Sequence, residues 1–500
     1  MSETNGANGV RPTNGTRLLK IAIVGAGFGG LGMAIRLKQE GFYDFTVFER
    51  GDSVGGVWRA NTYPGAACDV PSHLYSLSFA PGHRWTRRYA PQADILDYLN
   101  EVADDFGLRS HIRLNTEVER TTFDANSGTW ELETAAGETE RFDAVITACG
   151  QLTNPALPAI EGTDEFEGTI FHSAEWDHEH DLTGERVAVI GTGASAIQFV
   201  PPIAERVAHL DIYQRSAPWI LPKMDRAYPA WEQRLMRRFP ARVALPRLGL
   251  FAFFEAGTYA FTGKDWLMDL FARRASSYRE KELAGDPELL AKATPDYEMG
   301  CKRVLFTSDW YSTLMRANVD LWTEDVDRIT PGGVVTADGV EHPADTIIWG
   351  TGFRSHDFVA PMTVMGLDGR DLNELWGERP EAYLGMVVSG FPNFFVLYGP
   401  NTNHGSGSVP FTLECQYDFA LDALRHLHAG RRYIDLRPET QKRWRAEIAE
   451  RSVPTRWTRG GCDSWYINGE GVNTNNWPGP WLEFRRRTSR LDPSEFSLVG

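Results

Sequence analysis

Residues 19–30 read Leu-Lys-Ile-Ala-Ile-Val-Gly-Ala-Gly-Phe-Gly-Gly, and this stretch decides the fold. A short apolar strand runs directly into a glycine-rich turn, and residues 31–39 then show the apolar spacing of a helix. A second apolar strand, predicted over 45–48, ends in Glu49, which stands 24 residues after Gly25. A strand, a turn, a helix and a strand with a terminal acid are typical of a dinucleotide-binding domain.

Each defined position of this first turn has a physical role. Gly25 permits the tight turn, Gly27 lets the backbone approach a pyrophosphate, and Gly30 lets the helix and the strand pack closely. Phe28 lies inside the same turn, so we expect it to contact the cofactor. The helix N-terminus offers free N–H groups and a partial positive charge to phosphates. We expect Glu49 to accept hydrogen bonds from a ribose.

A second copy of the pattern starts at residue 186, with the turn Gly-Thr-Gly-Ala-Ser-Ala over 191–196. Here Arg215 stands 24 residues after Gly191, at the position that Glu49 occupies in the first copy. A carboxylate favours a free 2′-hydroxyl, whereas a guanidinium favours a 2′-phosphate through charged hydrogen bonds. The first site is therefore predicted to bind FAD and the second to bind NADPH. The alternative for Arg215 is an ordinary solvated charge at the end of a strand.

The two copies also end alike, because residues 143–150 and 345–352 are both apolar strands that run into a glycine turn. This internal repeat indicates a duplicated architecture. We predict an α/β fold with two Rossmann-like dinucleotide-binding domains and a helical insertion in the second. The predicted parts are a disordered tail at 1–17, an FAD-binding domain from 18–154 and 353–500, an NADPH-binding domain from 155–220 and 301–352, and the insertion at 221–300.

Charge and cysteine content narrow the possible functions. Acidic residues number 67 against 51 basic ones, a formal charge of −16 that argues against a nucleic-acid or anionic-membrane surface. The apolar stretch 243–261 is interrupted by Arg247 and Glu255, so we do not expect it to span a bilayer. The five cysteines are far apart and form no Cys-x-x-Cys pair, which argues against a metal site, a disulfide framework and a disulfide reductase. A reducing, cytoplasmic compartment is the expectation.

Residues 166–177 read Phe-Glu-Gly-Thr-Ile-Phe-His-Ser-Ala-Glu-Trp-Asp. This segment resembles the fingerprint of type I Baeyer–Villiger monooxygenases, Phe-x-Gly-x-x-x-His-x-x-x-Trp followed by Pro or Asp. Residues 55–69 resemble a second motif of that family, and the likeness runs from about Lys20 to beyond Pro400. At 350–353 the family commonly has Ala-Thr-Gly-Phe, whereas this chain begins with Gly350. Flavin-containing monooxygenases that oxidise heteroatoms usually end the first motif in Tyr or Phe, so Trp176 favours the Baeyer–Villiger type.

The resemblance implies an FAD-dependent enzyme that uses NADPH and O₂ to convert an apolar ketone to an ester or lactone, with possible sulfoxidation as a side activity. Reduced flavin would form a peroxide at its carbon C4a, and a fixed cation would stabilise the peroxide anion and the alkoxide formed on the ketone. Arg303 matches the family's active-site arginine, Asp69 matches its acidic partner, and His172 would couple the two domains. The alternatives are a surface charge at Arg303, a helix cap at Asp69 and a structural histidine.

Further residues are assigned to the cofactors by the same resemblance. Those expected at FAD are Gly56, Val57, Trp58, Asp69, Val70, Tyr75 and Val118. Those expected at NADPH are Thr192, Gly193, Ala194, Ser195, Ala196, Ile197, Gln198, Ser216, Lys302 and Arg303. The segment 401–406 either lies at the flavin ring or the substrate, or is a simple glycine turn.

Two other functions remain open at this point. A flavin-containing monooxygenase acting on S or N centres would use the same cofactors. A non-catalytic flavin-binding sensor would bind FAD but would show no substrate-stimulated consumption of NADPH. A product assay over ketones and sulfides distinguishes all three.

Overall fold

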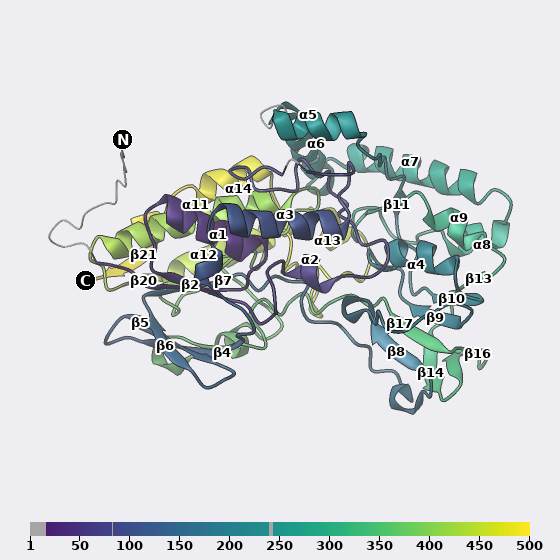
Figure 1. Ribbon diagram of the computed structural model, residues 1–500, viewed down its shortest axis with the longest axis horizontal. Helices are drawn as coiled ribbons and strands as arrows, with labels where there is room; N and C mark the ends of the chain where they lie inside the picture. Colours follow the sequence, from purple (N-terminus) through teal and green to yellow (C-terminus); the bar gives the residue numbers. More distant parts are fainter. Residues whose placement is uncertain (1–16, 83, 240–243) are drawn as a thin grey trace, which may run out of the picture.

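The computed structural model describes residues 17–82, 84–239 and 244–500. The predicted disordered tail therefore lies outside the described residues, except for its last residue, Arg17. The described part is an α/β structure built around two parallel five-stranded sheets (Figure 1). This confirms the predicted fold class, whereas the exact domain boundaries stay a prediction.

The first sheet has the strand order β19-β7-β1-β2-β3, and all of its neighbouring strands are parallel. Its strands are β1 (Ile21–Val24), β2 (Phe45–Phe48), β3 (Ile112–Arg113), β7 (Ala144–Thr147) and β19 (Phe394–Val396). Helices α1 (Phe28–Gln39) and α11 (Val409–His428) pack together on one face. On the other face lies a smaller sheet of β18 (Thr363–Met365), β4 (Val118–Asp124), β5 (Thr129–Thr134) and β6 (Thr139–Phe142).

The second sheet repeats this plan with the order β13-β10-β9-β17-β8. Its strands are β8 (Thr169–His172), β9 (Arg186–Ile190), β10 (His209–Tyr213), β13 (Val319–Trp322) and β17 (Thr346–Trp349). Helices α4 (Ala196–Ala204) and α9 (Trp310–Leu314) cover one face. Strands β14 (Val326–Thr330), β15 (Gly333–Thr336) and β16 (Glu341–Pro343) form an antiparallel sheet on the other. The middle strands β1 and β9 are mostly apolar, with Arg186 at the exposed start of β9, because both faces of each parallel sheet are covered.

Between β11 (Ile220–Leu221) and β12 (Leu305–Phe306), which pair with each other, the chain is helical. The helices are α5 (Ala230–Arg238), α6 (Ala244–Phe261), α7 (Asp265–Glu282) and α8 (Pro287–Lys292), and α5 to α7 run along one edge of the molecule (Figure 1). The remaining elements are α2 (Val57–Ala60), α3 (Gln92–Asp105), α10 (Leu372–Trp376), α12 (Pro438–Ser452), α13 (Arg456–Arg459), α14 (Trp481–Thr488), β20 (Tyr433–Leu436) and β21 (Phe496–Val499). Within the described ranges, the structure contains no helix with the length and apolarity needed to cross a bilayer.

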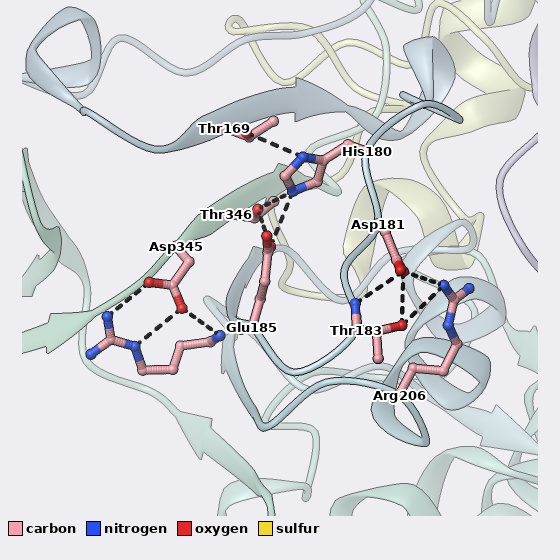
Figure 2. A network of polar contacts seen from close by, with 9 residues as sticks. Thr169, His180, Asp181, Thr183, Glu185, Arg206, Asp345 and Thr346 are labelled. Atoms are coloured by element: carbon pink, nitrogen blue, oxygen red, sulfur yellow. Dashed lines mark hydrogen bonds and ion pairs between the residues drawn. The ribbon is translucent and has the colours of Figure 1, made fainter.

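The segment that follows β8 is fastened to the second domain by a polar network (Figure 2). The Nε2 atom of His180 lies 2.9 Å from the Thr346 hydroxyl, which in turn donates a hydrogen bond of 2.7 Å to Glu185. Arg206 donates to Asp181 at 2.7 Å a little further along. These contacts hold the linker against β17 and against the end of α4.

Two of the cysteines form a pair in the structure. Cys301 and Cys462 form a disulfide across 161 residues of sequence, whereas Cys68, Cys149 and Cys415 are free. A single bridge is not the framework of disulfides that the spacing argued against, but the spacing gave no expectation of this pair. Spacing along the chain could not show the pairing, because tertiary folding brings the C-terminal loop against the segment that precedes β12.

Candidate active site

The first glycine turn leaves no room for side chains at two of its three defined glycines. Gly25 has φ +106°, and a Cβ atom placed on it would lie 2.6 Å from the Ala148 carbonyl oxygen. A Cβ atom on Gly30 would lie 1.8 Å from the Gly25 carbonyl oxygen, so glycine is required at both positions. Gly27 faces Gly56 across a narrow gap, and no side chain caps the N-terminus of α1 there. Backbone N–H groups are thus available to a pyrophosphate, as FAD binding requires.

Glu49 is buried directly beside this turn. One carboxylate oxygen accepts a hydrogen bond from the Ala26 N–H group and the other accepts one from the Gly51 N–H group, both at 2.8 Å. A carboxylate has about four acceptor positions, so two remain for ribose hydroxyls. The same negative charge disfavours a 2′-phosphate, which fits the assignment of this site to FAD.

The predicted flavin contacts fall into two groups. Phe28, Trp58 and Tyr75 lie together, with the Phe28 and Tyr75 rings 5.1 Å apart and the Trp58 Nε1–H group donating to the Tyr75 hydroxyl at 3.1 Å. Val70 is buried in the same hydrophobic cluster, next to Asp69. Val118, the first residue of β4, instead packs in the core between the first sheet and the smaller sheet that contains β4. The structure therefore does not bring it into the cluster of Phe28, Trp58 and Tyr75.

Arg303 and Asp69 form an ion pair that joins the two predicted nucleotide domains. The Arg303 Nε and Nη2 atoms donate to both carboxylate oxygens of Asp69 at 2.6 to 3.0 Å. This paired, planar geometry fixes the guanidinium more firmly than a single contact would. The Asp69 charge raises the pKa of Arg303 above its already high ordinary value. The cation is therefore permanent and fixed in orientation.

Two tyrosines that the sequence motifs do not indicate lie beside this pair. Burial raises the pKa of Tyr466 to about 12, although the positive charge of Arg303 acts in the opposite direction. Burial also raises the pKa of Tyr398, whose hydroxyl donates to Asn403 at 2.8 Å. Both phenols are neutral, and Tyr398 places the 401–406 segment near Arg303. Neither tyrosine lies in a recognised motif, so the sequence carried no signal for them.

His404 has a structural environment within that segment. Its ring lies 5.5 Å from the Trp481 ring and 5.9 Å from the Phe484 ring. Burial lowers its pKa to about 3, and neither ring nitrogen has a hydrogen-bond partner among the residues described. The imidazole is therefore a neutral, packed ring.

The second glycine turn is more open than the first. Gly191 has φ +107° and needs to be glycine, since a Cβ atom there would lie 2.5 Å from the Gly350 carbonyl oxygen. A Cβ atom on Gly193, by contrast, would have its nearest neighbour 3.9 Å away. Ala196 packs closely on Gly350, and its small side chain fits the third position of the pattern. Gly193 and Ala194 are exposed, whereas Thr192 is buried, and this segment leads into α4, whose first turn has no side-chain cap.

Arg215 and Lys302 meet at the edge of this second site. Lys302 donates a hydrogen bond of 2.6 Å to the Ser216 hydroxyl. Burial, together with the charge of Arg215, lowers the pKa of Lys302. Arg215 is exposed and lies 3.6 Å from Asp463. Two cations and a hydroxyl at one corner fit a 2′-phosphate.

The structure gives Gln198 a contact that the sequence did not predict. Its side-chain oxygen accepts from the Ala67 N–H group at 3.0 Å, and its side-chain nitrogen donates to the Ala67 carbonyl at 3.1 Å. The neighbouring Ile197 is buried in the core of the second domain. Gln198 thus connects α4 to the loop that leads to Asp69. Its assignment to the NADPH pyrophosphate stays a prediction.

His172 lies at the end of β8, buried, where β8 pairs with the end of β17. Its Nδ1 atom accepts a hydrogen bond from the Ala174 N–H group at 3.1 Å, and its ring lies 5.7 Å from the Phe353 ring. Burial lowers its pKa, so the ring is neutral near pH 7. His172 thus lies beside the end of β17, from which the chain returns to the first predicted domain at Phe353.

The fold and the site define a flavin monooxygenase with two nucleotide sites, and comparisons with known proteins agree. A family described as flavin-binding monooxygenase-like matches residues 18–248. A Baeyer-Villiger monooxygenase of Streptomyces coelicolor is 45% identical, over 96% of this chain and 93% of that protein. One of Pseudomonas aeruginosa is 44% identical, over 97% and 92%. The chain therefore belongs to the type I Baeyer–Villiger monooxygenases, which use FAD, NADPH and O₂ to insert oxygen beside a ketone carbonyl.

Solved structures support the same conclusion. A closed crystal structure of cyclohexanone monooxygenase has a TM-score of 0.85 at 28% identity, over 97% of this chain and all of that one (100%). An oxidized steroid monooxygenase bound to NADP has a TM-score of 0.84 at 30% identity, over 96% and 99%.

Proposed function

We propose that Arg303, held by Asp69, is the catalytic cation of this monooxygenase, and that the substrate is an apolar ketone. The observation that carries the proposal is the fork of hydrogen bonds between the two side chains, which come from different domains. Asp69 ends the segment 55–69, which we assign to the first nucleotide site. Arg303 directly follows Lys302, which we assign to the second. The guanidinium thus stands where two bound cofactors would meet.

When bound, FAD accepts a hydride from NADPH and activates O₂. The chain's own contribution is a preorganised positive charge. Negative charge develops on the carbonyl oxygen of a ketone during addition, and a fixed guanidinium stabilises it without reorganising. Arginine suits this role because it keeps its proton, and the Asp69 carboxylate raises its pKa further. Asp69 orients the guanidinium and balances its charge in the resting enzyme.

The surroundings of Tyr466 support an apolar substrate. Tyr466 belongs to a hydrophobic cluster with Phe261 and Trp457, and Trp219 and Phe306 pack against it. Such walls exclude water and bind apolar carbon, while a few polar groups set orientation. Helices α6 and α7 contribute Phe261 and Met268 to this cluster, so the insertion supplies part of the apolar surroundings of Tyr466, which lies beside Arg303.

The test is a product assay with the FAD-loaded enzyme, NADPH and O₂ over matched ketones and sulfides. We expect esters or lactones from apolar ketones. Sulfoxides alone would favour heteroatom oxidation, and FAD binding without substrate-stimulated NADPH use would favour a sensor.

Substitution at the ion pair tests the role of Arg303 itself. Arg303→Lys should lower the rate of ester formation about a hundred- to a thousandfold, the magnitude typical of one preorganised electrostatic group. FAD content should not change. The matched control is Arg328→Lys, at an exposed arginine of β14. Near wild-type ester formation by Arg303→Lys would remove this residue from the site. We also propose a cytoplasmic location, which protection from protease added to intact cells, lost on lysis, tests.

A further inference from the structure

The outward face of α6 is apolar along its whole length. Its exposed residues include Leu245, Leu248 and Phe253, which are 77%, 63% and 62% exposed. No charged residue within Ala244–Phe261 is exposed. Ordinary surface helices place apolar residues toward the core and charged residues toward water, so α6 has the reverse arrangement.

The two charged residues of α6 point inward and have partners. Arg247 donates to the His73 carbonyl at 2.9 Å and to the Ser76 hydroxyl at 3.1 Å. Glu255 accepts a hydrogen bond of 2.8 Å from the Trp481 N–H group. These contacts fix the rotation of the helix about its axis. The apolar face is therefore held outward by polar bonds on the inner side.

Positive charge and tryptophan surround this face. On α5, Trp231 is 63% exposed, and Arg234, Arg237 and Arg238 are exposed along the same helix. On α7, Trp266 is 66% exposed, and the exposed Arg273 and Arg274 follow it. The exposed acid of this part of α7, Asp269, is paired with Arg456. Figure 1 shows the three helices along one edge of the molecule, which we call the α5–α7 edge.

We propose that the α5–α7 edge docks on an anionic lipid surface, with α6 lying in the plane of the bilayer interface. Interfacial helices combine an apolar face with flanking arginines, and tryptophan favours the headgroup region. The arginines complement anionic headgroups, although the whole chain carries a formal charge of −16. α6 rests on the surface and does not cross it.

A second copy of the chain fits this edge less well. In a symmetric dimer the same patch meets itself, so the arginines of α5 and α7 would face like charges. A lipid surface supplies both the apolar layer and the opposite charge.

The inner side of α6 contacts residues near the proposed active site, so docking would bring a lipid surface close to that site. This step rests on the function proposed above. Ser406 donates a hydrogen bond of 3.2 Å to the Phe254 carbonyl, and the Phe261 ring stacks on Trp457 at 5.7 Å. One helix thus separates the docked surface from the cluster that contains Tyr466. An apolar substrate dissolved in lipid has a short path to the site.

Vesicle co-sedimentation of the FAD-loaded protein tests the docking without any turnover. The vesicles are phosphatidylcholine alone and phosphatidylcholine with phosphatidylglycerol, each at low and high salt. We expect binding to the anionic vesicles that weakens with salt. Leu248→Glu with Phe253→Glu should reduce binding at least tenfold. Arg234→Gln, Arg237→Gln and Arg238→Gln together should weaken binding to anionic vesicles about a hundredfold.

Matched controls use equally exposed residues elsewhere. Leu157→Glu with Val453→Glu changes two apolar residues outside these three helices that are 60% and 65% exposed, and Arg120→Gln, Arg328→Gln and Arg431→Gln remove three scattered arginines. Both control proteins should bind vesicles like the wild type, and FAD content shows that every variant is folded. Absence of binding by the wild type, or equal losses in the controls, would overturn the proposal. So would a dimer that Leu248→Glu with Phe253→Glu converts to a monomer while vesicle binding persists. A failed product assay leaves the vesicle result unaffected.

Discussion

Arg215 and Lys302 lie at one corner, where we expect the 2′-phosphate of the coenzyme, but differ in their exposure to water. Arg215 is 75% exposed and paired only loosely with Asp463, whereas Lys302 is largely enclosed and bonded to Ser216. A bound 2′-phosphate would compete with Asp463 for the guanidinium. An exposed ion pair of this kind contributes little to stability, so displacing Asp463 costs little.

Arg215 is expected to select NADPH over NADH. Arg215→Ala should weaken NADPH about ten- to a hundredfold, because a charged hydrogen bond contributes roughly 1.5–3 kcal/mol. Binding of NADH, which lacks the 2′-phosphate, should change little. Titrations of both coenzymes against the FAD-loaded enzyme measure the effect. Asp463→Asn is the control and should keep the preference for NADPH. Equal losses for both coenzymes would show that Arg215 does not select between them.

Lys302 is expected to make coenzyme binding depend on alkaline pH. Its pKa is lowered by burial and by Arg215, so it loses its charge at a lower pH than a free lysine. Attraction for the 2′-phosphate is complete below that lowered pKa and declines as pH rises through it. Lys302→Arg keeps the charge and should flatten the decline. Dissociation constants for NADP⁺ between about pH 7 and about pH 10 test this. Parallel curves for the two proteins would contradict it.

At the scale of elements, the two glycine turns look alike in sequence but differ in how closely the protein packs on them. Gly30 lies against the Gly25 carbonyl, whereas Gly193 has open space around its Cα atom. The protein's own packing requires glycine at position 30. At position 193 a requirement for glycine would come from a bound coenzyme.

Two substitutions separate these constraints. Gly193→Ala should leave the melting temperature and the FAD content unchanged, and should weaken NADP⁺ because the new methyl group meets the pyrophosphate. Gly30→Ala should lower both the melting temperature and the FAD content, because its Cβ atom would clash with the backbone. Thermal unfolding, flavin absorbance and NADP⁺ titration measure the three quantities. Unchanged NADP⁺ affinity in Gly193→Ala would place the pyrophosphate elsewhere.

Elements set by local patterns were predictable from the sequence. The strands that lead into Gly25 and Gly191 follow from short apolar runs, and the pairing of Arg303 with Asp69 was expected from the family motifs. The Cys301–Cys462 disulfide and the place of Tyr466 beside Arg303 were not predictable. Both depend on a C-terminal loop that folds back across the molecule. Contacts between residues so far apart in the sequence leave no periodic pattern from which they could be predicted.

For the whole molecule, several polar contacts connect the two predicted domains, among them the Arg303–Asp69 pair and the bonds of Gln198. Gln198 contributes two of them through Ala67, in the loop that leads to Asp69. The same loop therefore carries both a domain contact and the carboxylate that orients Arg303. Domain position and the geometry of the cation are coupled.

Gln198→Leu should slow reduction of the flavin by NADPH at saturating coenzyme. Two hydrogen bonds of about 1 kcal/mol each correspond to roughly a thirtyfold change in the docked population. FAD content should not change, and stopped-flow absorbance of the flavin gives the rate. Gln441→Leu is the control, since it also removes two side-chain hydrogen bonds of a glutamine, here to Ser389 and Glu381, and leaves the contact between Gln198 and Ala67 in place. A loss of NADP⁺ affinity with a normal rate at saturation would instead make Gln198 a pyrophosphate contact.

The position of β19 determines the order in which the domains can be completed during synthesis. All five strands of the second sheet lie within residues 169–349. The first sheet is complete only when β19, at residues 394–396, has been synthesised. Until the ribosome has released that segment, β7 remains an unpaired edge, and such edges invite pairing with other chains. The predicted FAD-binding domain is therefore the first to be started and the last to be completed. Once the chain up to residue 352 has left the ribosome, the second sheet has all of its strands, whereas the first sheet still lacks β19 and the helix α11 that packs on α1. The exposed β7 edge is therefore where chaperones must act or aggregation begins.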